Sequence, residues 1–268
     1  MTQQLEIVPV GSGIGAEVVG LDLGLDFSDE TYSRLRTALD ENGVLFVPDQ
    51  DLTVEQHQGL ARRFGDLLTT QELRKEADET QNIGDTWHVD GTYTAAPPAV
   101  TLLVARELPR YGGDTIWASM RTAYDALSES LKDTLEGLSA VHANVRGLTP
   151  SSAATVPPEP SVDAYDDAEG VLHPVVISHP GGFKSLFVNP AYTARFEGWT
   201  RRESLGLLNY LFQHCQRPEF SVRLHWRPGM VAIWDNTQVW HLAVNDYHGL
   251  RRVMSRAVVA GAPLKAAR

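Results

Sequence analysis

Short apolar runs alternate with glycine-rich turns along most of this chain, which is the pattern of a protein built largely from β-strands. In the first half, such runs occupy residues 5–10, 16–22, 44–47, 99–104 and 115–118. In the second half, they occupy residues 175–178, 185–188, 221–224, 231–234 and 253–259. Runs of this length are typical of strands and too short for most helices.

Apolar residues recur at helical spacing in only a few places. The positions that repeat in this way are Tyr32, Leu35 and Leu39, then Leu127, Leu131, Leu135 and Leu138, and finally Leu205, Leu208, Leu211 and Phe212. The segments 53–56 and 200–203 each begin with Thr and end with Gln or Glu, which is the capping-box signal for a helix start. Gly43 and Gly65 mark the ends of the first two helices.

These elements predict a mostly β fold with flanking helices (α+β), whose core is a β-sandwich or jelly-roll barrel. Helices and strands do not alternate regularly enough for a doubly wound sheet. We expect a single domain over residues 1–268. Residues 70–86 are polar and irregular, which favours an active-site lid, and residues 149–170, rich in Pro, Ser, Ala and Asp, predict an exposed loop.

Charge and cysteine content narrow the possible functions. The chain carries 34 acidic and 23 basic side chains, a net charge of −11, so nucleic acid and anionic membranes are poor partners. No apolar stretch reaches the length of a membrane span, and the polar N-terminus does not resemble a signal peptide. Cys215 is the only cysteine, which excludes an internal disulfide and Cys-rich metal sites. We therefore expect a cytoplasmic protein.

The segment Trp87-His88-Val89-Asp90 carries the first candidate chemistry. In a strand, residues two apart point to the same side, so His88 and Asp90 could present an imidazole and a carboxylate to one metal ion. A His-x-Asp triplet also arises often by chance, and alone it is a weak signal.

A third ligand can come from far downstream. His241 follows Trp234-Asp235-Asn236, at the end of a predicted strand. A barrel brings distant strands side by side, so His241 can complete the site that His88 and Asp90 begin. Two histidines and one carboxylate leave coordination positions open, which is the arrangement of non-haem iron(II) oxygenases.

With these motifs in view, the sequence resembles the TauD/TfdA family of Fe(II)- and 2-oxoglutarate-dependent dioxygenases. The matching segments, which extend over nearly the whole chain, are 15–22, 64–66, 87–90, 112–115 and the C-terminal run from 234 through His241 to Arg252 and Arg256. The resemblance implies a double-stranded β-helix (cupin-like jelly roll), an oxidoreductase activity, and Fe(II), 2-oxoglutarate and O₂ as its requirements.

The resemblance also implies roles for individual residues. His88, Asp90 and His241 match the iron ligands of the family. Arg252, eleven residues after His241, matches the arginine that binds the distal carboxylate of 2-oxoglutarate, and Thr115 matches the threonine that hydrogen-bonds this co-substrate. Arg256 matches the arginine that meets an anionic prime substrate.

The expected reaction is hydroxylation of a small anionic molecule, with release of succinate and CO₂. Asp90 occupies the carboxylate position that related halogenases leave vacant, which favours hydroxylation over halogenation. Leu68 and Gly84 stand where taurine-using members carry histidine and asparagine, so taurine is disfavoured. Arg256 favours a carboxylate, sulfonate or sulfate ester, such as an alkyl sulfate or a phenoxyalkanoate. The sequence allows a homo-oligomer.

Three alternatives stay open at this point. An enzyme of the same fold could carry out desaturation, epoxidation or ring expansion. A non-catalytic metal-binding barrel is a second reading, although it would have no need of Arg252 and Thr115. A zinc hydrolase with the same three ligands is the third, and it would act without O₂ or 2-oxoglutarate.

Overall fold

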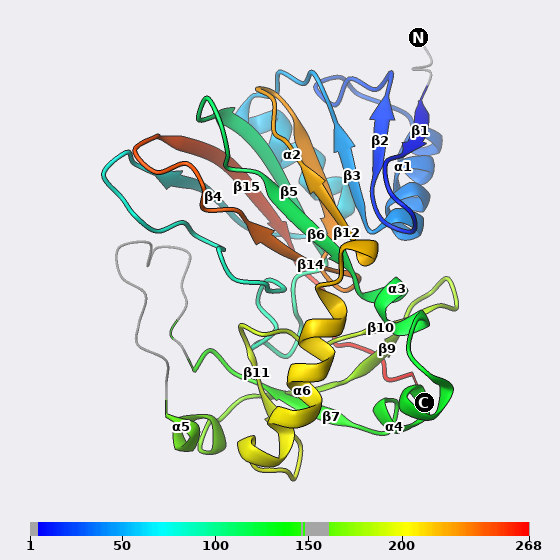
Figure 1. The fold of residues 1–268 in the computed structure, drawn as a ribbon. Coiled ribbons are helices and arrows are strands. Elements are labelled where there is room, and N and C mark those ends of the chain that lie inside the picture. The colour runs from blue at the N-terminus through cyan, green and yellow to red at the C-terminus, as the bar shows by residue number, and fades with distance from the viewer. Residues whose placement is uncertain (1–4, 146, 148–160, 268) are drawn as a thin grey trace.

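A computed structural model describes residues 5–145, 147 and 161–267 of the protein. Its largest element is a seven-stranded sheet with the strand order β1-β2-β3-β13-β5-β15-β4 (Figure 1). The strands are β1 (Glu6–Pro9), β2 (Ala16–Val19), β3 (Val44–Val47), β13 (Val231–Asp235), β5 (Val100–Glu107), β15 (Arg252–Val259) and β4 (Leu67–Lys75). All neighbours pair antiparallel except β2 and β3, which are parallel.

Both faces of this sheet are covered, which explains why its central strands are apolar throughout. On β3, Leu45 and Val47 face a cluster that includes helix residues such as Leu35 and Leu60. Val44 and Phe46, at the alternate positions, face the other side, where Phe46 packs against Trp117 of the second sheet with ring centroids 5.4 Å apart.

The second sheet has the order β12-β6-β14 and is antiparallel. Its strands are β12 (Ser221–Leu224), β6 (Thr115–Ser119) and β14 (Val239–Ala243). The core between the two sheets is built around Trp117 and Trp234, which are almost fully buried and pack edge to face. The two layers form the predicted strand-rich core with flanking helices.

Two helices lie behind the large sheet (Figure 1). Helix α1 (Asp29–Asn42) begins after the cap Ser28, whose side chain accepts a hydrogen bond from the Thr31 N–H. Helix α2 (Val54–Phe64) begins with the capping box predicted at residues 53–56. Both helices end at the predicted glycines, so the start and stop signals in the sequence are confirmed.

A second group of elements packs below the sheets in Figure 1. Its helices are α3 (Met120–Asp125), α4 (Glu129–Leu135), α5 (Val162–Asp166), α6 (Arg201–Cys215) and the 3₁₀ turn Pro218–Phe220. Its strands are β7 (Ser139–His142), β8 (Val171–Pro174), β9 (Val176–Ser178), β10 (Lys184–Leu186) and β11 (Thr193–Phe196). Helix α6 starts at its predicted capping box, and Cys215 at its end is a buried, free thiol.

Some predicted boundaries need correction. The apolar repeat from Leu127 to Leu138 spans only the short helix α4, because Ser128 caps its start and the chain turns into β7 soon after its end. Residues 70–75 of the predicted lid belong to β4, since they pair with β15 along its length. Residues 76–86 contain no helix or strand. Most of the predicted loop at 149–170 lies outside the described residues, and its described part contains helix α5.

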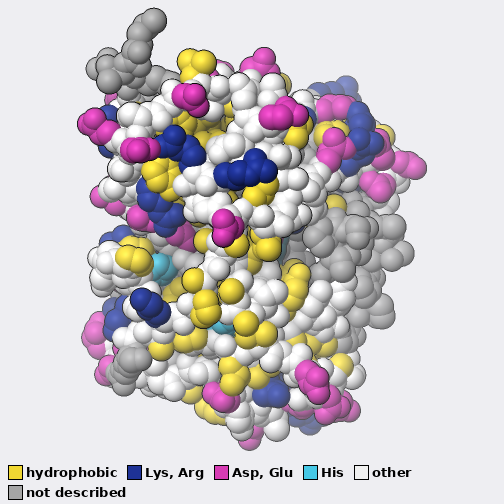
Figure 2. Space-filling view, turned by 180° about the vertical axis from the view of Figure 1, so that it is seen from behind, with side chains coloured by type: hydrophobic (Ala, Val, Ile, Leu, Met, Phe, Trp, Pro, Cys, Tyr) yellow, Lys and Arg dark blue, Asp and Glu magenta, His cyan; other side chains and the backbone are white. Residues whose placement is uncertain are grey.

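The surface carries both signs of charge. On the face in Figure 2, basic and acidic side chains are interspersed over the upper half and apolar ones are more frequent below. Among the described residues, no helix combines the length and the apolar character that crossing a membrane requires.

Candidate metal centre and co-substrate pocket

His88 and His241 lie side by side because their backbones pair directly. Each residue's N–H donates to the carbonyl oxygen of the other, at 3.1 and 2.9 Å, forming an isolated antiparallel bridge. The ring centroids are 4.0 Å apart. The expectation that residues 88–90 form a strand is therefore wrong: only His88 makes a bridge, and Asp90 lies in a turn. The site is assembled by this bridge between distant segments of the chain, and His241 lies on β14 (Val239–Ala243), after the turn that follows β13.

Asp90 closes the group. Its Oδ1 lies 3.6 Å from Nε2 of His88 and 3.9 Å from Nε2 of His241. Metal–ligand bonds of about 2 Å allow a single ion to contact three atoms separated in this way. Among the described residues, these three form the one group of histidine, cysteine or carboxylate side chains close enough to hold an ion.

The two imidazoles are prepared for coordination. Nδ1 of His88 hydrogen-bonds the carbonyl oxygen of Thr86 at 2.7 Å, so Nδ1 carries the proton and Nε2 presents its lone pair to the metal position. Burial, followed by the neighbouring His88, lowers the pKa of His241 well below its usual value. A neutral His241 is the form that binds a metal ion, so this donor set fits iron(II).

Asp90 remains ionised. Burial alone would raise the pKa of its carboxyl group, but Arg256 and the two histidines outweigh burial and hold that pKa well below its usual range. Nη1 of Arg256 lies 3.3 Å from Oδ1 of Asp90, and Nη2 donates to Gln71 at 3.0 Å. Arg256 therefore lies directly beside the candidate ligand Asp90.

A chain of buried hydrogen bonds supports Asp90 from behind. Thr101 donates to its Oδ2 at 3.2 Å, Asn236 donates to the Thr101 hydroxyl at 2.9 Å, and the Trp234 indole donates to Asn236 at 2.9 Å. Sequence reasoning noted the Trp234-Asp235-Asn236 motif but did not connect it to Asp90. Thr101 gave no signal, because a threonine in a central strand has no distinguishing pattern.

We expect Thr101→Val to weaken metal binding about tenfold, because it removes a hydrogen bond that orients Asp90 and keeps the side-chain shape. Anaerobic titration with Fe(II) measures this, and Thr70→Val, on the exposed side of β4, is the control. Unchanged metal affinity would show that Asp90 is held in place without Thr101.

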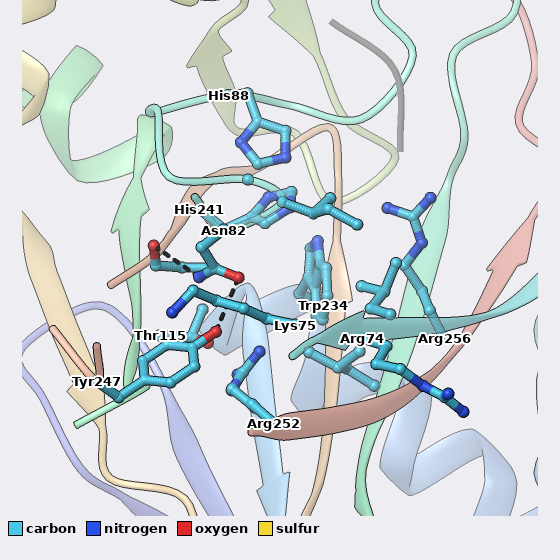
Figure 3. Close-up of a pocket in the computed structure, with 15 residues that line it drawn as sticks. Arg74, Lys75, Asn82, His88, Thr115, Trp234, His241, Tyr247, Arg252 and Arg256 are labelled. Atoms are coloured by element: carbon cyan, nitrogen blue, oxygen red, sulfur yellow. Dashed lines mark hydrogen bonds between the residues drawn. The ribbon is translucent and has the colours of Figure 1, made fainter. Parts of the chain in front are cut away.

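His88, His241 and Arg256 line a pocket, and Arg252 and Thr115 line the same pocket away from Arg256 (Figure 3). Arg252 is 5% exposed, and its Nε and Nη2 have no hydrogen-bond partner among the described residues. The Thr115 oxygen accepts from the Trp226 indole at 2.9 Å, which leaves its hydroxyl hydrogen free to donate. These unused donors around one buried cation suit a carboxylate.

Glycine is required beside both halves of the site. Gly84 has φ +83°, and a Cβ there would lie 3.1 Å from the His88 ring. Gly113 has φ +71°, and a Cβ there would lie 3.2 Å from Cδ of Arg252. Side chains at these positions would be strained and would push on the two groups. Leu68, in contrast, is 58% exposed and does not line the pocket, because it points outward from β4.

Sequence reasoning missed several polar residues that line the pocket, among them Lys75, Asn82 and Tyr247. The Tyr247 hydroxyl donates to Oδ1 of Asn82 at 2.9 Å, and burial raises the pKa of Tyr247 to about 12, so it stays protonated. The signal that could have found Lys75 is the alternation of β4. Gln71, Leu73 and Lys75 share one side of the strand, and pairing places Lys75 opposite Arg252.

The fold brings two histidines and a carboxylate together, and a buried arginine faces the same pocket. This combination defines the class of non-haem iron(II), 2-oxoglutarate-dependent oxygenases. Residues 6–258 match the family "Taurine catabolism dioxygenase TauD, TfdA family". The chain belongs to this family, as its motifs predict. It is thus an oxidoreductase that uses Fe(II), 2-oxoglutarate and O₂.

Individual relatives extend the comparison. The chain is 34% identical to an alkylsulfatase of Acinetobacter baylyi, over 97% of this chain and 86% of the relative. It is 32% identical to an (S)-phenoxypropionate/alpha-ketoglutarate-dioxygenase of Sphingobium herbicidovorans, over 98% and 97% of the two chains. The crystal structure of AAD-2 with Mn(II) and N-oxalylglycine matches with a TM-score of 0.84 at 28% identity, covering 98% of this chain and 99% of that one.

Proposed function

We propose that His88, Asp90 and His241 hold the iron(II) ion, and that Arg252 and Thr115 bind the distal carboxylate of 2-oxoglutarate. Arg256 then contacts the anionic head of the prime substrate. The observation that carries this assignment is the separation of the two arginines. Arg256 contacts Asp90, whereas Arg252 lies four residues earlier on β15 and lines the pocket with Thr115, and its Nε and Nη2 have no partner among the described residues. One pocket would therefore offer two distinct anion sites, one at Arg252 and one at Arg256.

The substrate class that suits this pocket is an alkyl sulfate ester. Arg256 provides a planar fork for a sulfate group, and Leu73, Leu103 and Ile83 provide apolar pocket walls for a carbon chain. The alkylsulfatase of Acinetobacter baylyi supports the same choice. An aryloxyalkanoate is the second candidate, since the Sphingobium herbicidovorans relative is named for such a substrate and its carboxylate would fit the same arginine.

The reaction can be written for the sulfate ester. With iron(II) bound, 2-oxoglutarate and O₂ would supply the oxidant that breaks a substrate C–H bond; 2-oxoglutarate leaves as succinate and CO₂, with one oxygen atom of O₂ in the succinate and the other in the substrate hydroxyl. Hydroxylation of the carbon next to the ester oxygen gives R–CH(OH)–OSO₃⁻. This hemiacetal ester then loses hydrogen sulfate and becomes the aldehyde R–CHO.

The protein residues position the reactants for this chemistry. Arg256 would hold the sulfate beside Asp90, so that the adjacent carbon faces the metal position. Thr101 and Asn236 keep the Asp90 carboxylate in place while the substrate exchanges. The apolar wall restricts water at the reacting carbon. Residues 76–86 remain a predicted lid over this pocket, since Asn82 and Ile83 line it.

An anaerobic titration tests the proposed function. Adding Fe(II) and then 2-oxoglutarate should produce a weak visible charge-transfer band, because the keto acid chelates the iron. Alkyl sulfates should then shift the band, while taurine should not. A metal-loaded protein without the band would not chelate the keto acid. A band that responds to phenoxypropionate alone would favour the aryloxyalkanoate.

We expect Arg256→Met to raise the KM for an alkyl sulfate at least tenfold, because it removes the cation that meets the anionic head. The affinity for 2-oxoglutarate should change less than threefold, and steady-state kinetics with each compound varied in turn separates the two. Since Arg256 also touches Asp90, the iron content of the variant is measured in parallel. Equal weakening of both compounds would mean that the two arginines share one ligand.

The assembly state and the compartment also remain predictions. We expect a cytoplasmic enzyme and allow a homo-oligomer, which size-exclusion chromatography with light scattering would detect.

A further inference from the structure

Lys75 is a buried lysine whose position the proposed function does not explain. It is the last residue of β4, it pairs with Arg252 of β15, and it is 2% exposed. Its neighbours Arg74 and Glu76 form ion pairs nearer the surface, but Lys75 points into the barrel and lines the pocket with Thr115 and Arg252 (Figure 3).

The ammonium group of Lys75 has no hydrogen-bond partner among the described residues. Its Nζ lies 4.2 Å from the centre of the Tyr247 ring, a cation–π contact. Burial lowers the pKa of Lys75, and Glu79 raises it in part. A cation–π contact offsets only a fraction of the cost of removing an ammonium from water. Among the described residues, no carboxylate therefore pairs directly with this ammonium.

Arg252 is a second buried cation in this pocket without a paired anion among the described residues. Its Nε and Nη2 are also without partners in the described part of the chain, so two cations on neighbouring strands face one pocket. A buried cation without a paired anion is unfavourable until an anion binds. Arg256 differs, because it already contacts Asp90 and Gln71. The shortage of negative charge is thus greatest at the Arg252 end of the pocket.

We infer that Lys75 is a second cationic contact for the distal carboxylate of 2-oxoglutarate, next to Arg252. This inference rests on the proposed assignment of Arg252 to that carboxylate. A carboxylate offers about four acceptor positions, of which an arginine fork uses two. Lys75 and Thr115 can donate to the others. The Tyr247 ring holds the ammonium without offering it a competing carboxylate, so no ion pair has to break before the co-substrate binds.

The test compares two ligands in two variants. The first ligand is 2-oxoglutarate and the second is 2-oxopentanoate, which has the same keto acid head but a methyl group in place of the distal carboxylate. Lys75→Met removes the charge and keeps the length of the side chain, and Lys75→Arg keeps the charge. Dissociation constants come from anaerobic titration of the Fe(II) protein, followed by calorimetry.

We expect Lys75→Met to weaken 2-oxoglutarate about tenfold or more and to leave 2-oxopentanoate within twofold. Lys75→Arg should retain most of the preference for 2-oxoglutarate. A merely structural lysine would give a different result, because its loss would change both ligands equally or neither. Either of those outcomes overturns the inference. If Lys75→Met fails to fold, as judged by circular dichroism, Lys75→Gln takes its place in the comparison.

Arg252→Met in the same assay separates this inference from the proposed function. If Arg252→Met abolishes the preference for 2-oxoglutarate and Lys75→Met does not reduce it, the co-substrate site stands and Lys75 has no part in it. If neither variant changes the preference, the distal carboxylate binds elsewhere and the assignment of Arg252 falls as well.

Discussion

Asp90→Ala is expected to abolish substrate oxidation. Asp90 is the only carboxylate among the three candidate ligands, and its removal leaves two neutral imidazoles as the whole donor set. The substitution also leaves the Arg256 guanidinium without its anion and Thr101 without its acceptor. We expect a loss of succinate formation by about a thousandfold, or roughly 4 kcal/mol in barrier height, together with much weaker iron binding.

Succinate release and bound iron are measured on the same samples. Asp78→Ala is a matched control, because Asp78 is an exposed carboxylate in the segment that leads to the site. It should retain wild-type activity and iron content. Oxidation at the wild-type rate in Asp90→Ala would show that the iron site lies elsewhere. Normal iron binding with no oxidation would instead assign Asp90 a role in the reaction rather than in holding the metal.

The sequence predicted which three side chains the structure brings together, but for a partly mistaken local reason. His88 and Asp90 were expected to share one side of a strand, yet only His88 makes a bridge and Asp90 lies in a turn. The turn brings Asp90 to the same place by a different backbone path. The motif identified the residues, because three side chains of the right type recur together. Their arrangement in space depends on the backbone pairing of His88 with His241, which the tertiary fold creates.

Helix ends were predicted well, since capping residues act locally. Thr53 and Thr200 bond to backbone groups three residues away, and these bonds need no tertiary context. Lys75 and Thr101 could not be predicted in this way. A lysine at the end of a polar segment normally indicates a solvated side chain, and only the register of β4 against β15 turns Lys75 toward Arg252. Long-range register is the information that local patterns lack.

Arg252→Met is expected to weaken 2-oxoglutarate roughly a hundredfold, equivalent to about 3 kcal/mol. Arg252 is buried, and its Nε and Nη2 have no partner in the part of the chain that the structure describes, so it would form a bidentate pair with the distal carboxylate. Methionine fills similar space without any donor. The remaining carboxylate would be buried beside Lys75 and Thr115 alone. Iron binding should change little, because Arg252 lies on the wall away from Asp90 and is not part of the metal group.

Arg251→Met is the matched control for this prediction. Arg251 precedes Arg252 but points outward, where it pairs with Glu76 and Glu107 at the surface. Surface ion pairs contribute little, so this variant should keep its affinity for 2-oxoglutarate within about twofold. The charge-transfer band, titrated with 2-oxoglutarate under anaerobic conditions, reports both variants directly. Equal affinities in Arg251→Met and Arg252→Met would exclude Arg252 as the carboxylate contact. A loss of affinity for 2-oxoglutarate in Arg252→Met alone would show that the co-substrate binds on the side of β15 toward which Arg252 points.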